Sequence, residues 1–165
     1  MNNFTCPHCG KSHEGDPTDY GWTLPDEVWE MPEEKREEQA KFNTDLCRWG
    51  ERYFIRSMMP IPFLDREGYF GWGVWVEVDQ SGFESYLNIY EADGSNEPRI
   101  PGTLANQIPG YNDLNECAVE IQFGPSDKRP MVYFTKNASC KLANEQRNGI
   151  NASRYHQILE SISEA

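Results

Sequence analysis

The chain has 165 residues, enough for one domain, and its 13% aromatic content provides ample apolar mass for a folded core. Its 27 acidic and 15 basic residues give a formal net charge of -12 at pH 7. Because nucleic-acid phosphates and anionic lipids are bound by clustered Lys and Arg, this charge argues against a nucleic-acid-binding protein and against membrane binding.

The N-terminal residues and the cysteines indicate the cellular compartment. Residues 1–15 have neither the basic segment nor the apolar stretch of a secretory signal. No run approaches the roughly 18 to 20 apolar residues that span a bilayer. The five cysteines are an odd number, and two have the spacing of metal ligands rather than of a disulfide framework. We therefore expect a cytoplasmic protein with no membrane segment.

The N-terminal third is irregular and then helical. Residues 1–25 are rich in Gly, Pro, Asp and His without a sustained period, which predicts a knuckle. Residues 26–42 predict a polar surface helix that begins near Pro32 and has Glu33 and Glu34 in its first turn, where the helix dipole favours anions.

Two strands are expected in the middle of the chain. Residues 53–55 predict a short strand that ends before Pro60 and Pro62. Residues 70–79 are the clearest strand, because alternate apolar residues share one face. That face carries Phe70, Trp72, Val74, Val76 and Val78, while Gly71 and Gly73 on the other face leave room for a packed helix or loop, or for a ligand.

The next expected helix is capped by Ser81 and runs to about Ala92. Apolar side chains recur on it at helical spacing and predict a core-facing stripe of Phe83, Tyr86, Leu87 and Tyr90. Residues 116–123 and 130–135 then predict a hairpin with a longer loop.

Two helices close the chain. The first covers residues 140–148 and stops at Gly149. The last is capped by Asn151 and carries a stripe of Tyr155, Ile158, Leu159 and Ile162. The absence of a regular strand–helix–strand alternation predicts the α+β class, with a mixed or antiparallel sheet packed against helices. We expect one compact domain, in which residues 1–50, the knuckle and the acidic helix, pack on an α+β body of residues 51–165.

One motif indicates a metal site. Cys6 and Cys9 are three positions apart, as in the thiolate pairs that bind tetrahedral zinc, and His13 follows within reach. Zinc needs a fourth ligand, for which Cys47 is the first candidate and His8 the second. These residues predict a structural Zn2+ ion.

Two other interpretations of the Cys pair are weaker. A redox pair is expected where a strand opens into a helix, whereas this motif lies among turn-forming residues. A catalytic zinc ion needs an open coordination position beside a general base. Glu14 is adjacent to His13, but a knuckle offers no obvious pocket.

Several segments together resemble a known family. They are Cys6-x-x-Cys9-Gly-x-x-His13, Asp45-Leu-Cys47, Trp72-Gly-Val-Trp75-Val, Leu104-Ala-Asn-Gln-Ile-Pro109-Gly-Tyr111 and Glu145-Gln-Arg-Asn-Gly-Ile150. Over nearly its whole length the chain resembles DUF2199, a bacterial family of unknown function. The resemblance supports grouping Cys47 with the knuckle, but it implies no activity. Where the family pattern has a His near the C-terminus, this chain has Cys140, so no role of that His carries over.

Charge is distributed unevenly along the chain. Residues 26–38 carry seven acids against Lys35 and Arg36, while residues 128–154 carry six bases against Glu145. Residues 77–97 carry acids and no base, which predicts either a solvated face or a partner-binding surface at Glu77, Asp79, Glu84, Glu91 and Asp93.

The sequence favours a binding protein over an enzyme. It contains no Ser/His/Asp or Cys/His arrangement and no phosphate-binding glycine loop. Glu145, Gln146 and Arg147 form a polar cluster that is interpreted as a solvated helix end or, less readily, as a site. The leading hypothesis is an acidic immunity protein that neutralises a basic bacterial toxin. The alternatives are a zinc-dependent enzyme and a zinc-knuckle adaptor.

Overall fold

The computed structural model describes residues 17–164. In chain order, these residues form β1 (Asp19–Gly21), α1 (Asp26–Trp29), α2 (Glu33–Gln39), β2 (Ala40–Phe42), β3 (Leu46–Trp49), β4 (Arg52–Pro62), β5 (Tyr69–Val78), α3 (Gln80–Asn88), β6 (Ile100–Leu104), the 3-10 helix η1 (Leu114–Glu116), β7 (Val119–Gln122), β8 (Met131–Phe134), α4 (Lys141–Asn148) and α5 (Ala152–Glu164). No helix among them is long and apolar enough to cross a bilayer.

The strands form one mixed sheet. Strands β4 to β8 close into a ring, because β4 and β5 pair with each other as well as with β8 and β6. β1 adds to β5, and β3 and then β2 extend from β4. The β1–β5 and β4–β8 pairs are parallel and the others antiparallel, including the predicted β7–β8 hairpin. The predicted α+β class is confirmed. Of the predicted knuckle, residues 1–25, the Cys6–His13 motif lies outside the described residues, and in the described part Asp19–Gly21 form β1.

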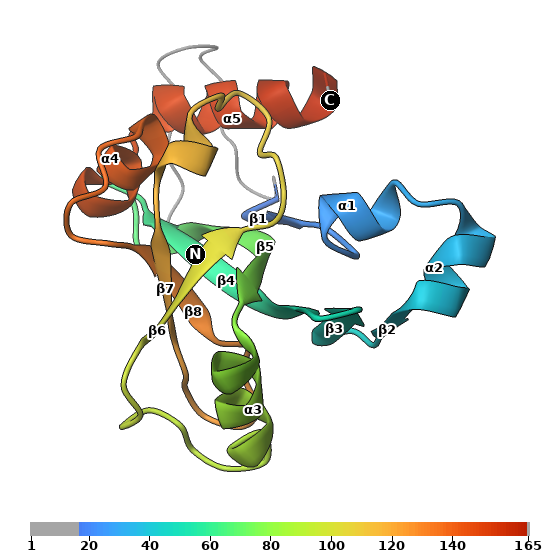
Figure 1. Ribbon diagram of the computed structural model, residues 1–165. Coiled ribbons are helices and arrows are strands. Elements are labelled where there is room, and N and C mark those ends of the chain that lie inside the picture. The colour runs from blue at the N-terminus through green and yellow to red at the C-terminus, as the bar shows by residue number, and fades with distance from the viewer. Residues whose placement is uncertain (1–16, 165) are drawn as a thin grey trace.

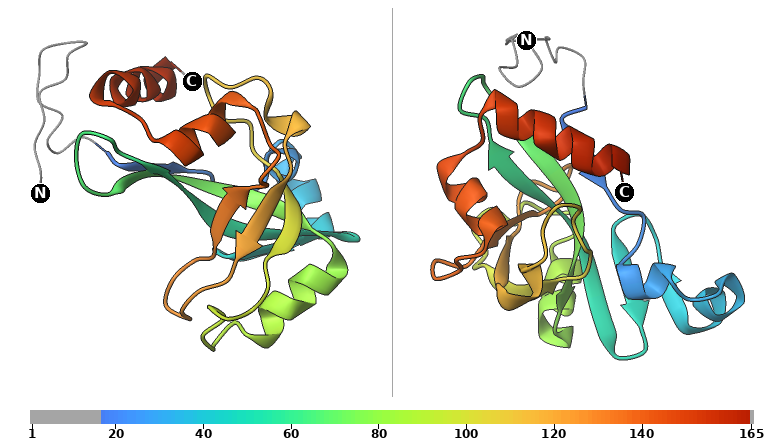
Figure 2. Two further views of the ribbon diagram at one scale, coloured as in Figure 1. Left: turned by 90° about the vertical axis from the view of Figure 1, so that its left-hand side faces the viewer. Right: turned by 90° about the horizontal axis from the view of Figure 1, so that it is seen from above.

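The core and the helices are arranged around the ring of strands β4 to β8. Apolar side chains from the ring strands, α3, α4 and α5 form the main core. α5 covers one end of the sheet and α3 lies at the opposite end (Figures 1 and 2). Each end of the ring is therefore covered by an amphipathic helix.

β4 corrects the expectation of a short strand that ends before the prolines. It runs for 11 residues, and Pro60 and Pro62 pair with Gly71 and Tyr69 of β5. In β4 the backbone N–H groups of Arg56 and the even-numbered residues that follow point away from β5. No described strand pairs with this side of β4 at positions 60 and 62. The prolines, which lack an N–H group, therefore remove no hydrogen bond between strands.

β5 confirms the clearest expected strand. Phe70, Trp72, Val74 and Val76 are fully buried on one face, and Val78 is nearly so. On the other face, a Cβ at Gly71 would meet the Met58 sulfur at 2.3 Å, and one at Gly73 would meet the Gly21 Cα at 3.2 Å. The space beside the glycines is therefore filled by a side chain of β4 and the backbone of β1, not by a helix, a loop or a ligand.

α3 is shorter than expected, and its cap is different. Asp79, not Ser81, caps the helix, because its carboxylate accepts the Gly82 N–H at 2.7 Å. Phe83 and Tyr86 are buried as predicted. The other half of the stripe, Leu87 and Tyr90, is exposed; α3 ends at Asn88 and not near Ala92, so Tyr90 lies in the turn that follows the helix.

The C-terminal helices match their sequence signals. Gly149 has a φ of 84° and ends α4, and the Asn151 side chain accepts the Arg154 N–H at 2.8 Å. On α5, Tyr155 and Ile158 are buried, and Leu159 and Ile162 pack partly against the core. These signals succeed because caps and amphipathic stripes are local features.

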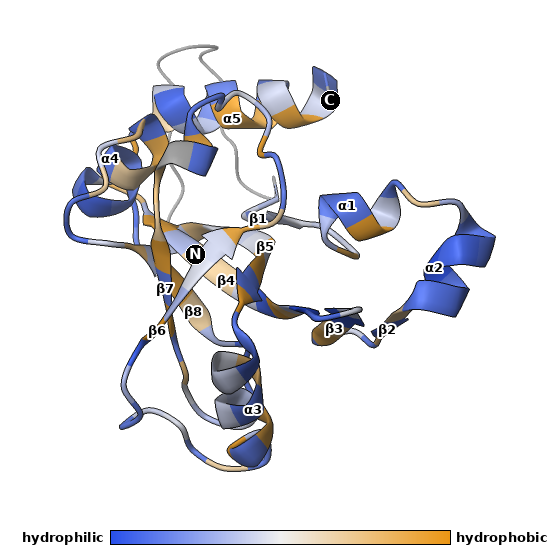
Figure 3. Ribbon diagram, in the orientation of Figure 1, coloured by the Kyte–Doolittle hydropathy of each residue, from blue (hydrophilic) through white to orange (hydrophobic). Residues whose placement is uncertain are grey.

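α1 and α2 extend away from the ring and are called here the acidic arm (Figure 1). α2 follows Pro32 and buries no side chain, which confirms the predicted surface helix (Figure 3). A second apolar cluster holds the arm to the sheet and consists of Leu24, Val28, Ala40, Cys47, Phe54 and Trp75.

Candidate functional site

β4 changes its edge partner halfway along the strand. The Arg56 N–H donates to the carbonyl of Asp45 at 2.9 Å, and the Met58 N–H donates to that of Pro130, also at 2.9 Å. From this point β3 runs antiparallel to β4 and β8 runs parallel to it, so the two strands diverge. The turn before β3 and the loop before β8 therefore meet beside the middle of β4. We call this meeting point the fork.

A groove with a cavity volume of about 460 Å³ opens at the fork. It is called the fork groove. Its lining combines aromatic, thioether and charged side chains from the two loops, from α3 and from three strands: Asp45, Met58, Tyr69, Tyr86, Tyr90, Ser126, Asp127, Lys128, Arg129 and Met131. A volume of this order is typical of sites that bind small organic molecules.

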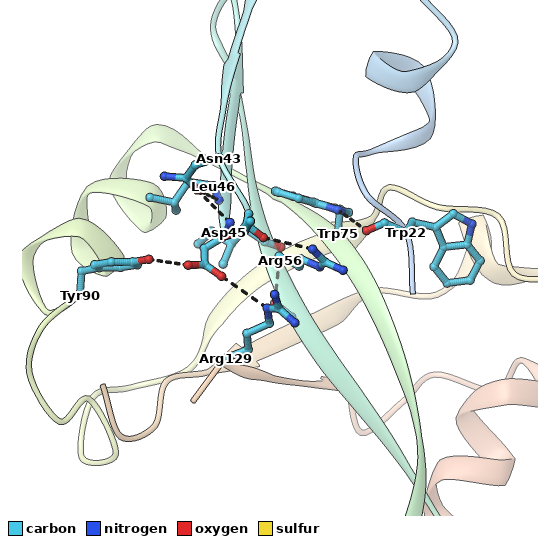
Figure 4. Close-up of polar contacts among 11 residues, drawn as sticks. Trp22, Asn43, Asp45, Leu46, Arg56, Trp75, Tyr90 and Arg129 are labelled. Atoms are coloured by element: carbon cyan, nitrogen blue, oxygen red, sulfur yellow. Dashed lines mark hydrogen bonds and ion pairs between the residues drawn. The ribbon is translucent and has the colours of Figure 1, made fainter. Parts of the chain in front are cut away.

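Asp45 is the centre of the polar network in the groove (Figure 4). The side chain of Asn43 accepts the N–H groups of Asp45 and Leu46, each at 2.8 Å, and so fixes the turn. The Asp45 carboxylate accepts the Tyr90 hydroxyl at 2.5 Å and faces Nε of Arg129 at 3.4 Å. Asp45 thus links α3 to the β7–β8 loop.

Arg56 places a second guanidinium near the same carboxylate (Figure 4). One of its terminal nitrogens donates to the Thr44 carbonyl at 3.3 Å, and its buried Nε has no hydrogen-bond partner among residues 17–164. Burial and the charge of Arg129 lower the pKa of Arg56, and Asp45 offsets this in part. Two arginines therefore face the Asp45 carboxylate at the fork, where Lys128 and Asp127 add one further charge of each sign.

Tyr86 and Tyr90 stay protonated at neutral pH. Burial, reinforced by Tyr90 and Asp45, raises the pKa of Tyr86 to about 12. The hydrogen bond to Asp45, with some burial, also raises the pKa of Tyr90. Neither hydroxyl is therefore an activated base or nucleophile. The groove is equipped to bind through hydrogen bonds, ring contacts and charge.

The Tyr86→Phe variant is expected to resist alkaline unfolding better than the wild type. The raised pKa of Tyr86 means that its protonated form stabilises the fold; this contribution is complete below pH 10 and is lost as the pH rises through about 12. Urea unfolding across this range should show a smaller loss of stability in the variant and nearly equal stabilities at pH 7. Parallel curves for the two proteins would contradict this assignment.

Two of the predicted partner-binding acids have internal roles. Glu77 forms a bidentate contact with Arg52, at 2.9 and 2.7 Å, and Arg52 also contacts Glu27 at 2.5 Å. Asp79 caps α3 as described above. Both carboxylates therefore have partners within the described fold, and neither is free for a cation of another protein.

The other three predicted acids lie on or after α3. Glu84 is exposed and accepts a hydrogen bond from Gln80 at 3.2 Å. Asp93 is exposed and accepts the Ser95 N–H at 2.9 Å, which fixes a turn and lowers the pKa of Asp93 together with the Ser95 hydroxyl. Glu91 is exposed. These three residues remain accessible, but they no longer form a continuous set with Glu77 and Asp79.

The acidic arm carries a denser set of free carboxylates. Its only arginine, Arg36, folds inward, donates to the carbonyls of Val28, Trp29 and Met31, and stacks over the Trp29 ring at 4.8 Å. Trp29 is nevertheless 57% exposed. Five exposed carboxylates have no ion-pair partner among residues 17–164; they are Glu30, Glu33, Glu34, Glu37 and Glu38.

The comparison with known protein families concerns nearly the whole chain. A family model, DUF2199, described as an uncharacterized protein conserved in bacteria, matches residues 5–150. The chain belongs to this family. No curated protein and no solved structure matches it. Membership of DUF2199 therefore establishes relationship without indicating an activity.

The Glu145-Gln146-Arg147 segment of this DUF2199 chain is a structural clamp. The Gln146 side chain accepts the Phe134 N–H at 2.9 Å and donates to the carbonyls of Val132, at 3.1 Å, and Pro60, at 3.4 Å. It thus joins β8 to β4 where the strands have diverged. A terminal nitrogen of Arg147 donates to two further carbonyls, at 2.8 and 3.1 Å. The interpretation of this segment as a solvated helix end is wrong for Glu145 and Gln146, whereas Arg147 is exposed in the last turn of α4.

Glu145 belongs to a second buried network. Its carboxylate accepts the Arg154 Nε–H at 2.5 Å and the hydroxyl of Tyr111. The Arg154 side chain also donates to the Tyr111 hydroxyl at 3.0 Å. Because the Glu145 side chain is 12% exposed and that of Arg154 is 18% exposed, this ion pair is largely desolvated and joins α4 to α5.

The metal ligands predicted from the sequence are only partly covered by the structure. Cys6, His8, Cys9 and His13 lie outside the described residues. Cys47 lies on β3, is 1% exposed and belongs to the apolar cluster under the acidic arm. Burial raises the pKa of its thiol to about 12. Residues 17–164 contain no group of three His, Cys, Asp or Glu side chains arranged to hold a metal ion.

Cys140 is the N-cap residue of α4, without a side-chain cap hydrogen bond, and is buried. Its N–H donates to the sulfur of Cys117 at 3.3 Å. Both thiols are free and buried.

Proposed function

We propose that this protein is a non-enzymatic binding protein that uses the acidic arm to hold a basic protein partner. The observation that carries the proposal is the set of five unpaired, exposed carboxylates on the arm beside the exposed ring of Trp29. Opposite charges speed the encounter of two proteins, and exposed aromatic rings are frequent anchors of interfaces.

The geometry of the arm supports this proposal. Arg36, the residue that would otherwise neutralise the surface, is engaged with backbone carbonyls and with Trp29. The carboxylates therefore face solvent with only Lys35 as a nearby free cation in the described arm. α2 buries no side chain of its own, so its sequence is free to serve a surface role.

A basic bacterial toxin is the partner class that best suits this surface. A toxin that acts on nucleic acid must carry a cationic surface, and a small acidic protein can occlude that surface by occupying it. The protein is then an immunity protein that neutralises the toxin. This version of the proposal rests on charge complementarity and on size.

Charge reversal on the arm is expected to abolish capture of the partner. A tagged variant with Glu33, Glu34, Glu37 and Glu38 changed to Lys should recover at least about tenfold less partner from the native host than the wild type, because attraction becomes repulsion. Capture by the wild type should also weaken as salt is raised. The measurement is quantitative mass spectrometry of the co-purified proteins.

The matched control reverses the other accessible acids, Glu84, Glu91 and Asp93. It changes a similar amount of charge, so retained capture by this variant separates the arm from a general charge effect. If this control loses the partner and the arm variant keeps it, the docking surface lies at α3 instead. If the wild type captures no basic protein, the proposal fails.

We further propose that Cys6, Cys9 and His13 hold a structural zinc ion. Two thiolates and an imidazole at this spacing are typical zinc ligands, and the fourth ligand is either Cys47 or His8. The apolar surroundings of Cys47 favour His8, because metal ligands are usually oriented by hydrogen-bonding partners.

Metal analysis of two variants tests both parts of the zinc proposal. Cys6→Ser should lose the zinc ion, and chelation of the wild type should lower its melting temperature, because the energy of metal binding contributes to folding. Cys47→Ala should keep the zinc ion and lose about 1 to 2 kcal/mol of stability from the small cavity it leaves. Zinc loss in Cys47→Ala would identify Cys47 as the fourth ligand. A metal-free wild type would end the proposal, and an apo form that stays equally stable but loses an activity would favour an enzyme.

A further inference from the structure

The fork groove is not used by the proposed function. It shares no residue with the acidic arm, and it is the place where the chain gathers free cationic groups beside rings. Its walls are formed by Tyr69, Tyr86 and Tyr90, with the thioethers of Met58 and Met131 between the loops. Flat aromatic and polarisable thioether surfaces suit a planar apolar group.

Cationic side chains at the fork outnumber carboxylates: Lys128 and Arg129 line the groove together with Asp45 and Asp127, and Arg56 adds a third cation beside Asp45. The Asp45 carboxylate already has contacts with Tyr90 and Arg129. Within residues 17–164, Arg129 contacts only this carboxylate, through Nε at 3.4 Å, so its two terminal nitrogens are free. The side-chain ammonium of Lys128, on the same loop, has no hydrogen-bond or ion-pair partner among residues 17–164; its backbone N–H donates to the Pro125 carbonyl at 3.1 Å.

Arg56 adds to this imbalance from behind Asp45. Its buried Nε has no partner, and its guanidinium and that of Arg129 face the same single carboxylate. Buried charge of one sign is stabilised by a counter-charge, and the described chain supplies only part of it here. An incoming anion would complete the pairing.

We propose that the fork groove binds a small organic anion that carries a planar apolar ring. The anionic group lies at Arg129 and Lys128, and the ring lies against the tyrosines and methionines. A cation is the alternative for a pocket lined by tyrosines and acids, but Arg129 and Lys128 would repel it. The volume of about 460 Å³ accommodates a ligand of about two fused rings with a phosphate or carboxylate group.

Titration with naphthyl phosphate tests the proposal. Calorimetry should show one site per chain, with naphthol and inorganic phosphate each binding at least about tenfold more weakly, because each lacks one half of the recognised chemistry. Naphthoate measures whether a carboxylate serves as well as a phosphate. Naphthylmethylamine, which has the same ring and the opposite charge, should not bind.

Three variants separate recognition from a structural effect. Arg129→Gln should weaken naphthyl phosphate binding about tenfold, because a charge-assisted contact is lost. Asp45→Asn should strengthen it about threefold, because a competing negative charge is removed while the shape is kept. Arg99→Gln, on an arginine that stacks on Tyr133 outside the groove, should leave binding unchanged.

Three results of these binding experiments would overturn the proposal. Equal binding of naphthol, of naphthylmethylamine and of naphthyl phosphate would show unspecific adsorption to apolar surface. If Asp45→Asn weakens naphthyl phosphate binding while its melting temperature is unchanged, the Asp45 carboxylate helps to hold the ligand and does not compete with it. Absence of binding by every anionic probe to the wild type would also reject it. None of these results bears on the acidic arm, because its variants and its readout are different.

Discussion

Replacing Asn106 with Ala is expected to lower the free energy of unfolding by about 3 to 4 kcal/mol, because a buried backbone N–H and a buried carbonyl lose their partners. Asn106 is 5% exposed. Its side chain accepts the Trp75 N–H at 2.7 Å and donates to the Leu24 carbonyl at 3.0 Å and to Asp26 at 2.9 Å. One amide thus joins β5 to the segment that begins the acidic arm.

Asn115→Ala provides the control for this experiment. Asn115 is exposed, so its replacement should change stability by no more than about 0.5 kcal/mol. Hydrogen exchange in Asn106→Ala should show faster exchange at the Trp75 amide and along the arm. A loss below about 1 kcal/mol would mean that a water molecule replaces the amide in the variant.

Glu145→Gln is expected to cost about 3 kcal/mol, because it leaves the largely buried guanidinium of Arg154 without its counter-charge. The substitution keeps the size of the side chain, so packing changes little. Urea unfolding at neutral pH measures the effect. Glu84→Gln, at an exposed site on α3, should be nearly neutral.

A double variant distinguishes charge from packing at this ion pair. In Glu145→Gln/Arg154→Met the uncompensated charge is gone, so the double variant should recover at least half of the stability lost by Glu145→Gln. Additive losses in the double variant would instead show that each side chain acts through its own packing and hydrogen bonds.

Local signals in the sequence predicted the local structure well. The alternation from Phe70 to Val78 identified β5 and its buried face, and Gly149 and Asn151 marked the ends of α4 and α5. The prolines of β4 misled the prediction, because a strand tolerates proline where the missing N–H would face an unpaired edge. Edge pairing is a property of the whole sheet and cannot be read from a segment.

For the candidate functional surfaces too, the sequence predicted what is local and the structure was needed for contacts between distant residues. Counting charges along the chain identified residues 26–38 as acidic, but only the structure shows that Arg36 turns inward and leaves the carboxylates unpaired. The set of Glu77 and Asp79 with the later acids was predicted from their proximity in sequence. Arg52, 25 residues from Glu77, neutralises part of it.

By itself the sequence determined the charge, the family, the α+β class and the Cys-x-x-Cys motif, because these depend on composition or on neighbours along the chain. The fork groove and the contacts of the Glu145-Gln146-Arg147 segment could be seen only in the tertiary structure. Asp45 and Arg129 are 84 positions apart and meet only because β3 and β8 both begin at the middle of β4. A contact at that separation is set by ring closure and strand register, which no local pattern encodes.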